Sequence, residues 1–132
     1  MILVDANVPM YAVGAEHPNK LPALRFLRRV AEGEIEAAID AEILQEVIHR
    51  YTALGRWAEG KVVYETVRAL FPDVLAITGD VVDQAKLLVD ASASLTARDA
   101  VHAAVVRVYR LEGICSFDRD FDRIPGCLRI EP

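Results

Sequence analysis

Aspartates stand directly after two short apolar runs of this sequence. Asp5 follows "ILV" at 2–4, and Asp118 follows "ICSF" at 114–117. Short apolar runs predict buried strands, and open α/β sheets place their sites at the carboxyl ends of such strands. A single strand-end aspartate is more often a turn or cap residue, but two of them favour a shared site. Carboxylates gathered in this way are suited to metal-assisted hydrolysis of a phosphodiester bond.

Two predicted helices supply further acids. Glu46 lies in "AEILQEVIHRY" beside an apolar helical stripe, although periodicity alone does not choose between Glu46 and Glu42. In "TARD", Thr96 and Asp99 have the spacing of a capping box, which is a structural reason for an acid there. A carboxylate in the first turn of a helix would also point into the rim that the strand ends define. Asp99 can therefore serve both purposes.

The charged stretch "SFDRDFDRI" at 116–124 carries three aspartates at alternate positions. Asp118, at the end of the strand, is the acid of this stretch that could share a crevice with Asp5. Asp122, next to Arg123, has the character of an ordinary turn acid. His102, one turn after Asp99, is more typical of a helix face than of a metal ligand.

Carboxylates that share a site raise one another's pKa, so three or four of them need a cation to stay ionised together. Mg²⁺ and Mn²⁺ are hard ions that take oxygen ligands. The sequence contains no P-loop, GxGxxG, HExxH or Ser–His–Asp pattern that would indicate a different chemistry.

Apolar runs and helical patterns alternate along the chain. Alternation of this kind predicts an α/β fold with a mostly parallel sheet and helices on both faces. Asn7, Asn19, Asp40 and Thr78 (or Asp80) are the candidate helix caps. The expected strands are 2–4, 34–39, 74–78, 114–117 and 127–130, and the expected helices are one from about residue 8 and those at 21–31, 41–53, 57–71, 80–89 and 96–111.

The composition is that of one ordinary globular domain, 1–132, with 53% hydrophobic residues. No apolar run approaches the ~18 residues of a membrane span, and no signal peptide is evident, so a cytosolic location is expected. Cys115 and Cys127 are expected to be buried core residues. A net charge of −5 argues against broad affinity for nucleic acids, but bound metal would invert the field locally.

An ordered set of motifs carries a resemblance to a known family. "ILVDANV", "EILQEV", "TARDAVHAA" and "ICSFDRDFDRIPG", in this order, resemble the PIN domain, and within it the VapC-type toxins of toxin–antitoxin pairs. The resemblance implies a three-layer α/β/α fold and a Mg²⁺- or Mn²⁺-dependent ribonuclease with an acidic quartet. It assigns Asp5, Glu46, Asp99 and Asp118 to that quartet, and so favours Glu46 over Glu42.

The same resemblance implies a role for each of these side chains. Asp5, Asp99 and Asp118 would hold the metal, while Glu46 would ligate it or position the attacking water. Asp120 is a further acid of uncertain rank, and Asn7 and Ser116 would orient the ligands. Arg98, Arg119 or the cluster Arg25, Arg28 and Arg29 would contact RNA phosphates.

The family also implies partners: an RNA substrate, a second copy in a homodimer, and a small antitoxin, with no membrane. Trp57, Tyr64 and Tyr51 are candidates to line the antitoxin groove, although Trp57 also suits a core anchor. Two alternatives remain open, a PIN nuclease of RNA maturation without an antitoxin and a non-catalytic binding module of the same fold. A receiver- or phosphatase-like domain would need a second acid pair near Asp5 and a late lysine, which are absent.

Overall fold

Five short strands form an all-parallel sheet in the order β3–β2–β1–β4–β5, in a computed structural model that describes residues 1–132. This confirms the predicted α/β class, and each strand lies within or beside an expected apolar run. The strands are β1 Ile2–Val4, β2 Ala37–Asp40, β3 Val74–Leu75, β4 Ile114–Cys115 and β5 Arg129–Ile130.

The central strand β1 explains why its sequence is apolar without alternation. Leu3 and Val4 are fully buried because β1 pairs with β2 on one side and with β4 on the other. Val4 is in register with Cys115 of β4. The residues that follow these two strands, Asp5 and Ser116, therefore lie side by side at the carboxyl edge of the sheet.

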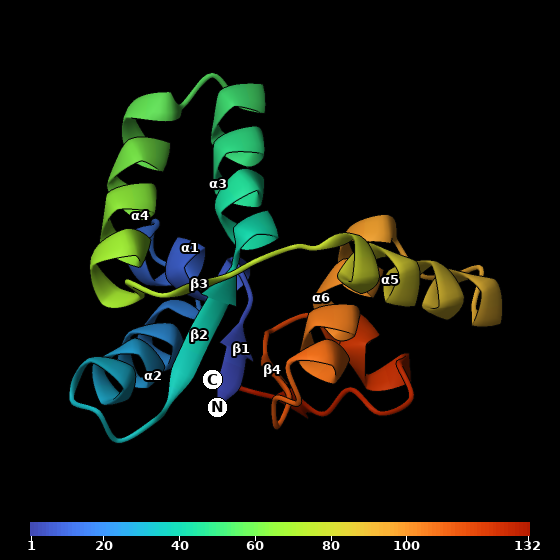
Figure 1. Cartoon of the computed structure of the whole chain (residues 1–132). Coiled ribbons are helices and arrows are strands. Elements are labelled where there is room, and N and C mark those ends of the chain that lie inside the picture. Colours follow the sequence, from blue (N-terminus) through green and yellow to red (C-terminus); the bar gives the residue numbers. More distant parts are fainter.

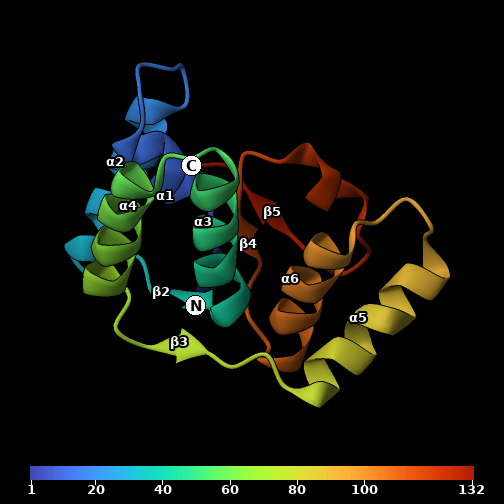
Figure 2. The same ribbon diagram turned by 90° about the horizontal axis from the view of Figure 1, so that it is seen from above.

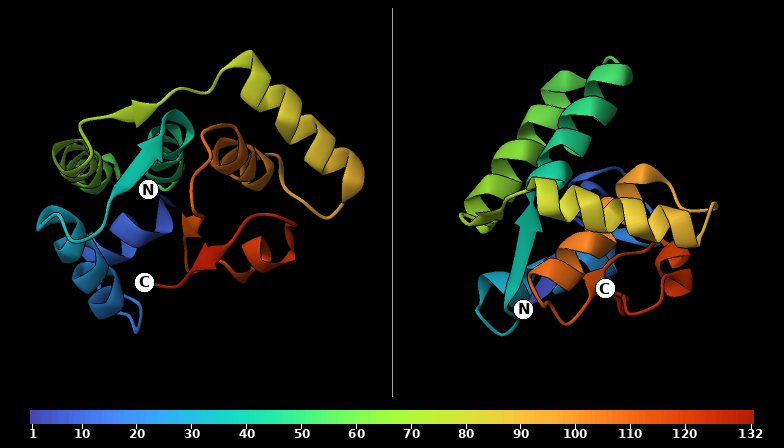
Figure 3. Two further views of the ribbon diagram at one scale, coloured as in Figure 1. Left: turned by 60° about the horizontal axis from the view of Figure 1, so that its bottom comes forward. Right: turned by 45° about the vertical axis from the view of Figure 1, so that its right-hand side comes forward.

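Helices flank the sheet on both faces, as the sequence predicts. In Figures 2 and 3, α1 and α2 lie together on one side of the strands, and α5 and α6 pack against each other on the other side. The helices are α1 Asn7–Val13, α2 Lys20–Ala31, α3 Ala41–Ala53, α4 Trp57–Leu70, α5 Gly79–Ala91 and α6 Ala97–Val108, with a 3₁₀ helix η1 at Arg119–Arg123.

Helix caps follow the sequence in part. The side chains of Asp40, Thr78 and Thr96 accept hydrogen bonds from the first turns of α3, α5 and α6. Asn19 stands at the cap position of α2 but makes no capping bond. The predicted cap at Asn7 is wrong, because α1 begins at Asn7 and the Asn7 side chain turns towards Asp5 and Ser116 instead.

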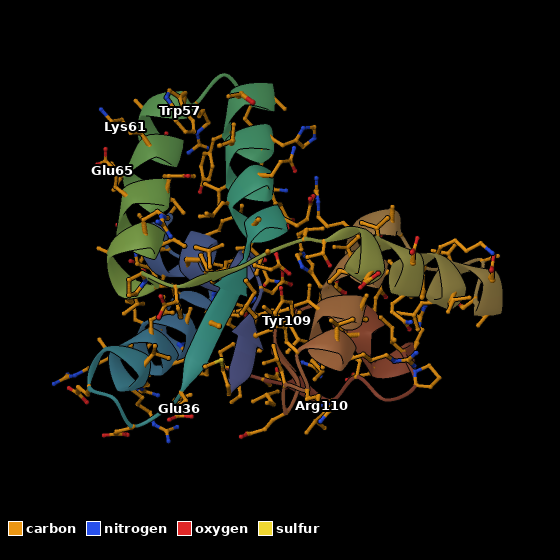
Figure 4. The ribbon with its side chains drawn as sticks, in the orientation of Figure 1. Glu36, Trp57, Lys61, Glu65, Tyr109 and Arg110 are labelled. Carbon is orange, nitrogen blue, oxygen red and sulfur yellow. The ribbon has the colours of Figure 1, made fainter.

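The α3–α4 hairpin rises beyond the carboxyl ends of the strands (Figure 1). Its two helices pack closely at Gly60, where an added Cβ would lie 2.4 Å from the Cβ of Tyr51. Figure 4 shows Lys61 and Glu65 on the outer side of α4 and Trp57 at the tip of the hairpin, where Trp57 is 41% exposed. Trp57 is therefore no core anchor, whereas Cys115 and Cys127 are buried as expected. None of the helices has the length and apolar character needed to cross a membrane.

Candidate active site

Ser116 links the two strand ends that the sequence singles out. Its hydroxyl donates a 2.6 Å hydrogen bond to Asp5 Oδ2 and accepts the backbone N–H of Asp118 at 3.0 Å. The Asn7 side-chain amide donates to the same Asp5 oxygen at 2.9 Å and to Ser116 Oγ at 3.0 Å. Asp5 is thus fixed by two side chains that come from segments more than 100 residues apart.

Burial dominates the electrostatics of Asp5. The residue is 6% exposed, and loss of solvation raises the pKa of its carboxyl to about 6, against the effect of the nearby His102 and the Ser116 hydrogen bond. The neighbouring charge of Glu46 raises the pKa further. Keeping Asp5 ionised in this position costs free energy unless a cation approaches it.

Asp40 and His102 form a fully buried pair next to Glu46. Asp40 Oδ1 accepts the N–H of Ile43, and Asp40 Oδ2 lies 2.8 Å from His102 Nδ1. The other ring nitrogen, Nε2, lies 3.8 Å from Glu46 Oε2, which is too long for a hydrogen bond. Burial lowers the pKa of His102, but the Asp40 hydrogen bond and the carboxylates of Glu46 and Asp5 outweigh it and raise the pKa to about 10.

Arg98 contacts the two glutamates of α3 differently. Its guanidinium donates a hydrogen bond to Glu42 Oε1 at 3.2 Å and lies 3.7 Å from Glu46 Oε1. Glu42 is therefore engaged in an ion pair, whereas Glu46 keeps Oε2 buried without a hydrogen-bond partner. The second atom in the same condition is His102 Nε2.

A second acidic group comprises Asp99, Asp118 and Asp120. One carboxylate oxygen of each lies within 4.8 Å of the others. Partial burial raises the pKa of Asp99, and the charges of Asp118 and Asp120 add to the rise, against the hydrogen bond to Thr96. Thr96 Oγ1 accepts the N–H of Asp99, which is one half of the predicted capping box, and the carboxylate remains directed at its acidic neighbours.

The family is decided by comparison with known proteins. The family model described as "PIN domain" matches residues 2–126. The chain belongs to the PIN-domain family. It is 41% identical over 130 residues to ribonuclease VapC13 of Mycobacterium tuberculosis, which covers 98% of this chain and 99% of that protein. Ribonuclease VapC23 of the same species is 35% identical, over 89% of this chain and 93% of the relative.

Solved structures agree with the PIN assignment at the level of the fold. The crystal structure of VapBC2 from Rickettsia felis, bound to a DNA fragment from its promoter, matches with a TM-score of 0.78 and 15% identity, over 99% of this chain and 98% of that one. VapC20 of Mycobacterium tuberculosis, described as a toxin that cleaves the sarcin–ricin loop, matches with a TM-score of 0.73 and 22% identity, over the whole of both chains.

In this PIN domain the expected quartet divides into two groups. Asp5 and Glu46 lie with His102, and Asp99 and Asp118 lie with Asp120. Ser116 connects the two groups through its bonds to Asp5 and to the backbone of Asp118. Asp122 is exposed and pairs with Arg129 at 2.8 Å, outside both groups.

Two residues of this PIN-domain site were not expected from the sequence. His102 is 1% exposed and not a helix-face residue, and Asp40 is more than a helix cap. The sequence signal was the run "AVHAAVV" at 100–106, in which His102 is the only polar residue, and the structure buries every residue from His102 to Val106. A helix without a polar face is surrounded by protein, so a histidine within it needs an internal partner.

A cavity of about 540 Å³ adjoins the site between α1 and the α3–α4 hairpin. Asn7 and Glu46 line it together with Tyr11 and Tyr51, whereas Trp57 and Tyr64 do not. Of the three aromatic residues expected to line a partner groove, only Tyr51 lies here. Arg28 and Arg29 pair with Glu32 and Glu34 near the start of β2, at the end of the sheet opposite to the site.

Proposed function

We propose that this PIN-domain protein is a metal-dependent endoribonuclease that hydrolyses RNA phosphodiester bonds at its acidic groups. The observation that carries the proposal is the convergence of Asp5, Glu46, Asp99 and Asp118 on one edge of the sheet, in two groups joined by Ser116. Relatives that match almost the whole chain are named ribonucleases, which supports RNA as the substrate.

The residues fit a divalent cation. Glu46 Oε2 is buried without a hydrogen-bond partner, and burial together with neighbouring carboxylates raises the pKa values of Asp5 and Asp99. Asp5, Asp99 and Asp118 would hold Mg²⁺ or Mn²⁺, with Glu46 ligating it or orienting water. When bound, such a cation neutralises the carboxylates, stabilises charge on the scissile phosphate and acidifies water.

Other side chains of the site would orient the carboxylates or contact the substrate without taking part in the reaction. Ser116 and Asn7 hold one oxygen of Asp5, which keeps the carboxylate in a single orientation. Arg98 restrains Glu46 from the solvent side at 3.7 Å. Arg119 is exposed beside Asp118, where its guanidinium can pair with an RNA phosphate.

The proposal includes the role of toxin in a type II toxin–antitoxin pair. Two structural neighbours, a toxin–antitoxin complex from Klebsiella pneumoniae and VapBC2 from Rickettsia felis, support a VapB-like antitoxin as the partner. The cavity beside the site is lined by charges of both signs, and its Glu59 is paired with Arg56. Glu16 and Glu46 are the carboxylates of this lining that a basic side chain of an amphipathic segment could reach. We further propose a homodimer that acts in the cytoplasm, and light scattering of the purified protein tests the dimer.

Incubation of the purified protein with structured RNA, in Mg²⁺ or Mn²⁺ and in EDTA, tests the nuclease. Cleavage is expected only with metal and is expected to be lost in Asp5→Asn, with cut sites mapped by sequencing of RNA ends. Full activity of the Asp5→Asn variant or of the EDTA-treated protein would contradict the proposal. Metal binding without cleavage of any RNA would favour the non-catalytic module, and the absence of a short open reading frame beside the gene would favour RNA maturation.

A further inference from the structure

Two buried polar atoms face each other inside the molecule, and neither has a hydrogen-bond partner. They are His102 Nε2 and Glu46 Oε2, 3.8 Å apart. Buried polar atoms are nearly always paired in folded proteins, so an unpaired couple needs an explanation. Together with one oxygen of Asp5 they form a set in which all three atoms lie within 4.8 Å of one another.

Asp40 fixes the orientation of the His102 ring. Its Nδ1 lies 2.8 Å from Asp40 Oδ2, and both side chains are inaccessible to solvent, at 1% and 0% exposure. Histidines that bind metals usually donate the other ring N–H to a carboxylate, which fixes the tautomer and orients the ligating nitrogen. Asp40 stands in that position relative to His102 and leaves Nε2 directed at Glu46.

Arg98 restrains the orientation of the Glu46 carboxylate. Arg98 lies 3.7 Å from Oε1 of Glu46 and is itself bound to Glu42 and Gln45. Arg98 therefore accounts for one oxygen and leaves the buried one, Oε2, turned inward. Asp5 is restrained in the same way, since Ser116 and Asn7 both donate to its Oδ2.

We propose that Asp5, Glu46 and His102 form a mixed nitrogen–oxygen site for a first-row transition-metal ion, Mn²⁺ or Zn²⁺, in preference to Mg²⁺. Neighbouring donors bound to one ion at ~2.1 Å are about 3.4 Å apart in a tetrahedral site and about 3.0 Å apart in an octahedral one, so Nε2 and Oε2, at 3.8 Å, must approach by about 0.4–0.8 Å. The Asp5 oxygen lies within 4.8 Å of both and closes the site by a side-chain movement of roughly an ångström.

The donor set determines the preference. Imidazole suits Zn²⁺ best of the three ions, whereas Mg²⁺ favours oxygen donors and retained water; Mn²⁺ lies between them, at the weak end of the first-row series. The second group, Asp99, Asp118 and Asp120, offers oxygen atoms alone and so lacks this discrimination. In the absence of an ion, the carboxylates favour a proton on His102, which the ion displaces.

Pulsed electron paramagnetic resonance of Mn²⁺ bound to the whole, metal-stripped protein tests the inference directly. The chain has three histidines, and His17 and His49 are both exposed and outside the two acidic groups. The expected result is a ¹⁴N coupling of coordinated imidazole in the wild type and in the matched control His49→Gln. The coupling is expected to disappear in His102→Gln.

Calorimetric titration with Mn²⁺ and with Mg²⁺ supplies a second readout. We expect His102→Gln to weaken Mn²⁺ binding about tenfold or more, and Asp40→Asn to weaken it by a similar factor through the orientation of the ring. Mg²⁺ binding, for which Asp5, Asp99 and Asp118 supply only oxygen atoms, is expected to change much less. Circular dichroism establishes whether the variants fold. If a variant does not fold, the presence or absence of ¹⁴N coupling in the electron paramagnetic resonance spectrum of the wild type still tests the inference.

Absence of ¹⁴N coupling from Mn²⁺-saturated wild type, or absence of Mn²⁺ binding at millimolar concentration, would overturn the inference. An unchanged ratio of Mn²⁺ to Mg²⁺ affinity in folded His102→Gln would do the same. The inference rests on the proposed function only in that both use Asp5 and Glu46. RNA cleavage with Mg²⁺ but no nitrogen coupling refutes the mixed site alone, whereas nitrogen coupling without RNA cleavage refutes the nuclease alone.

Discussion

The two acidic groups of the site are held in different ways. The group of Asp5, Glu46 and His102 lies largely inside the protein, and its members are restrained by Ser116, Asn7, Arg98 and Asp40. The group of Asp99, Asp118 and Asp120 lies nearer to solvent. Its restraints are local, such as the bond from the Asp120 N–H to Asp118 Oδ1 at 2.9 Å.

The contrast indicates a division of work. The inner group has fixed geometry at a cost in stability, because buried charges must be compensated by other buried charges. The outer group sits on the 3₁₀ helix η1 and on the first turn of α6, where side chains can adjust to a substrate. We expect substitutions in the inner group to change both activity and stability, and those in the outer group to change activity more modestly.

The largest expected effect separates Asp5 from Asp120. Asp5→Asn removes a negative charge that Glu46 and His102, the other members of its group, do not replace. RNA cleavage is expected to fall at least ~100-fold, because substitution of residues that merely orient metal ligands already lowers activity 10–100-fold. Asp120→Asn is expected to lower cleavage less than ~10-fold, because Asp99 and Asp118 remain. Initial rates of RNA cleavage measure both, and equal losses would remove the distinction between the groups.

The next effect concerns stability and compares two helix caps. Asp40→Ala removes the cap of α3 and leaves His102 buried without its partner, so the free energy of unfolding should fall by about 3 kcal/mol or more. Thr96→Ala removes only the cap of α6, beside the outer group, and should cost about 1 kcal/mol. Urea denaturation measures both values. Losses of the same size would show that the Asp40–His102 pair adds nothing beyond capping.

A pH dependence follows from the pKa of Asp5. The folded protein raises this pKa from 3.8 to about 6, so the native state binds more protons than the unfolded state between these values. The contribution of Asp5 to stability is present at low pH and is lost as pH rises from about 4 through about 6, by about 3 kcal/mol in all. Metal-free wild type and Asp5→Asn, unfolded in urea from pH 4 to pH 7, should diverge in this direction, with Asp5→Asn the more stable at pH 7. Parallel curves would contradict the expectation.

The smallest effect tests the link between the groups. Ser116→Ala removes the hydroxyl that joins Asp5 to the backbone of Asp118, and we expect RNA cleavage to fall about tenfold. Ser116→Thr keeps the hydroxyl and is the matched control, with an expected change of less than ~3-fold. If the alanine variant kept wild-type activity, the two groups would act independently.

The fold was largely predictable because its signals are local. Apolar runs without alternation marked the buried parallel strands, and Asp40, Thr78 and Thr96 marked the starts of three helices. The prediction of Asn7 as a helix cap failed because its side chain can either cap a helix or donate to distant side chains. Its partner Ser116 lies 109 residues away in the sequence, so no local pattern reports the second possibility. Strand lengths were overestimated, as at 74–78, where only Val74 and Leu75 pair with β2.

The sequence could name the acids that gather at this edge of the sheet, but not the residues that surround them. Asp5 and Asp118 could be inferred from strand ends, whereas the choice of Glu46 over Glu42 needed the family resemblance. The structure gives a physical reason for that choice, since Arg98 pairs with Glu42 at 3.2 Å while Glu46 retains a buried, unpaired oxygen. The contact between Asp40 and His102 joins residues 62 positions apart, and no local pattern reports it.

The position of β1 between β2 and β4 also has a consequence for biosynthesis. Asp5 leaves the ribosome early, but the hydroxyl that orients it belongs to Ser116, which is added 111 residues later. Strand β1 likewise lacks its neighbour β4 until Ile114 and Cys115 have been made. The site therefore cannot assemble in a nascent chain until synthesis has passed Ser116. For an enzyme that attacks RNA, this order of assembly postpones activity during translation.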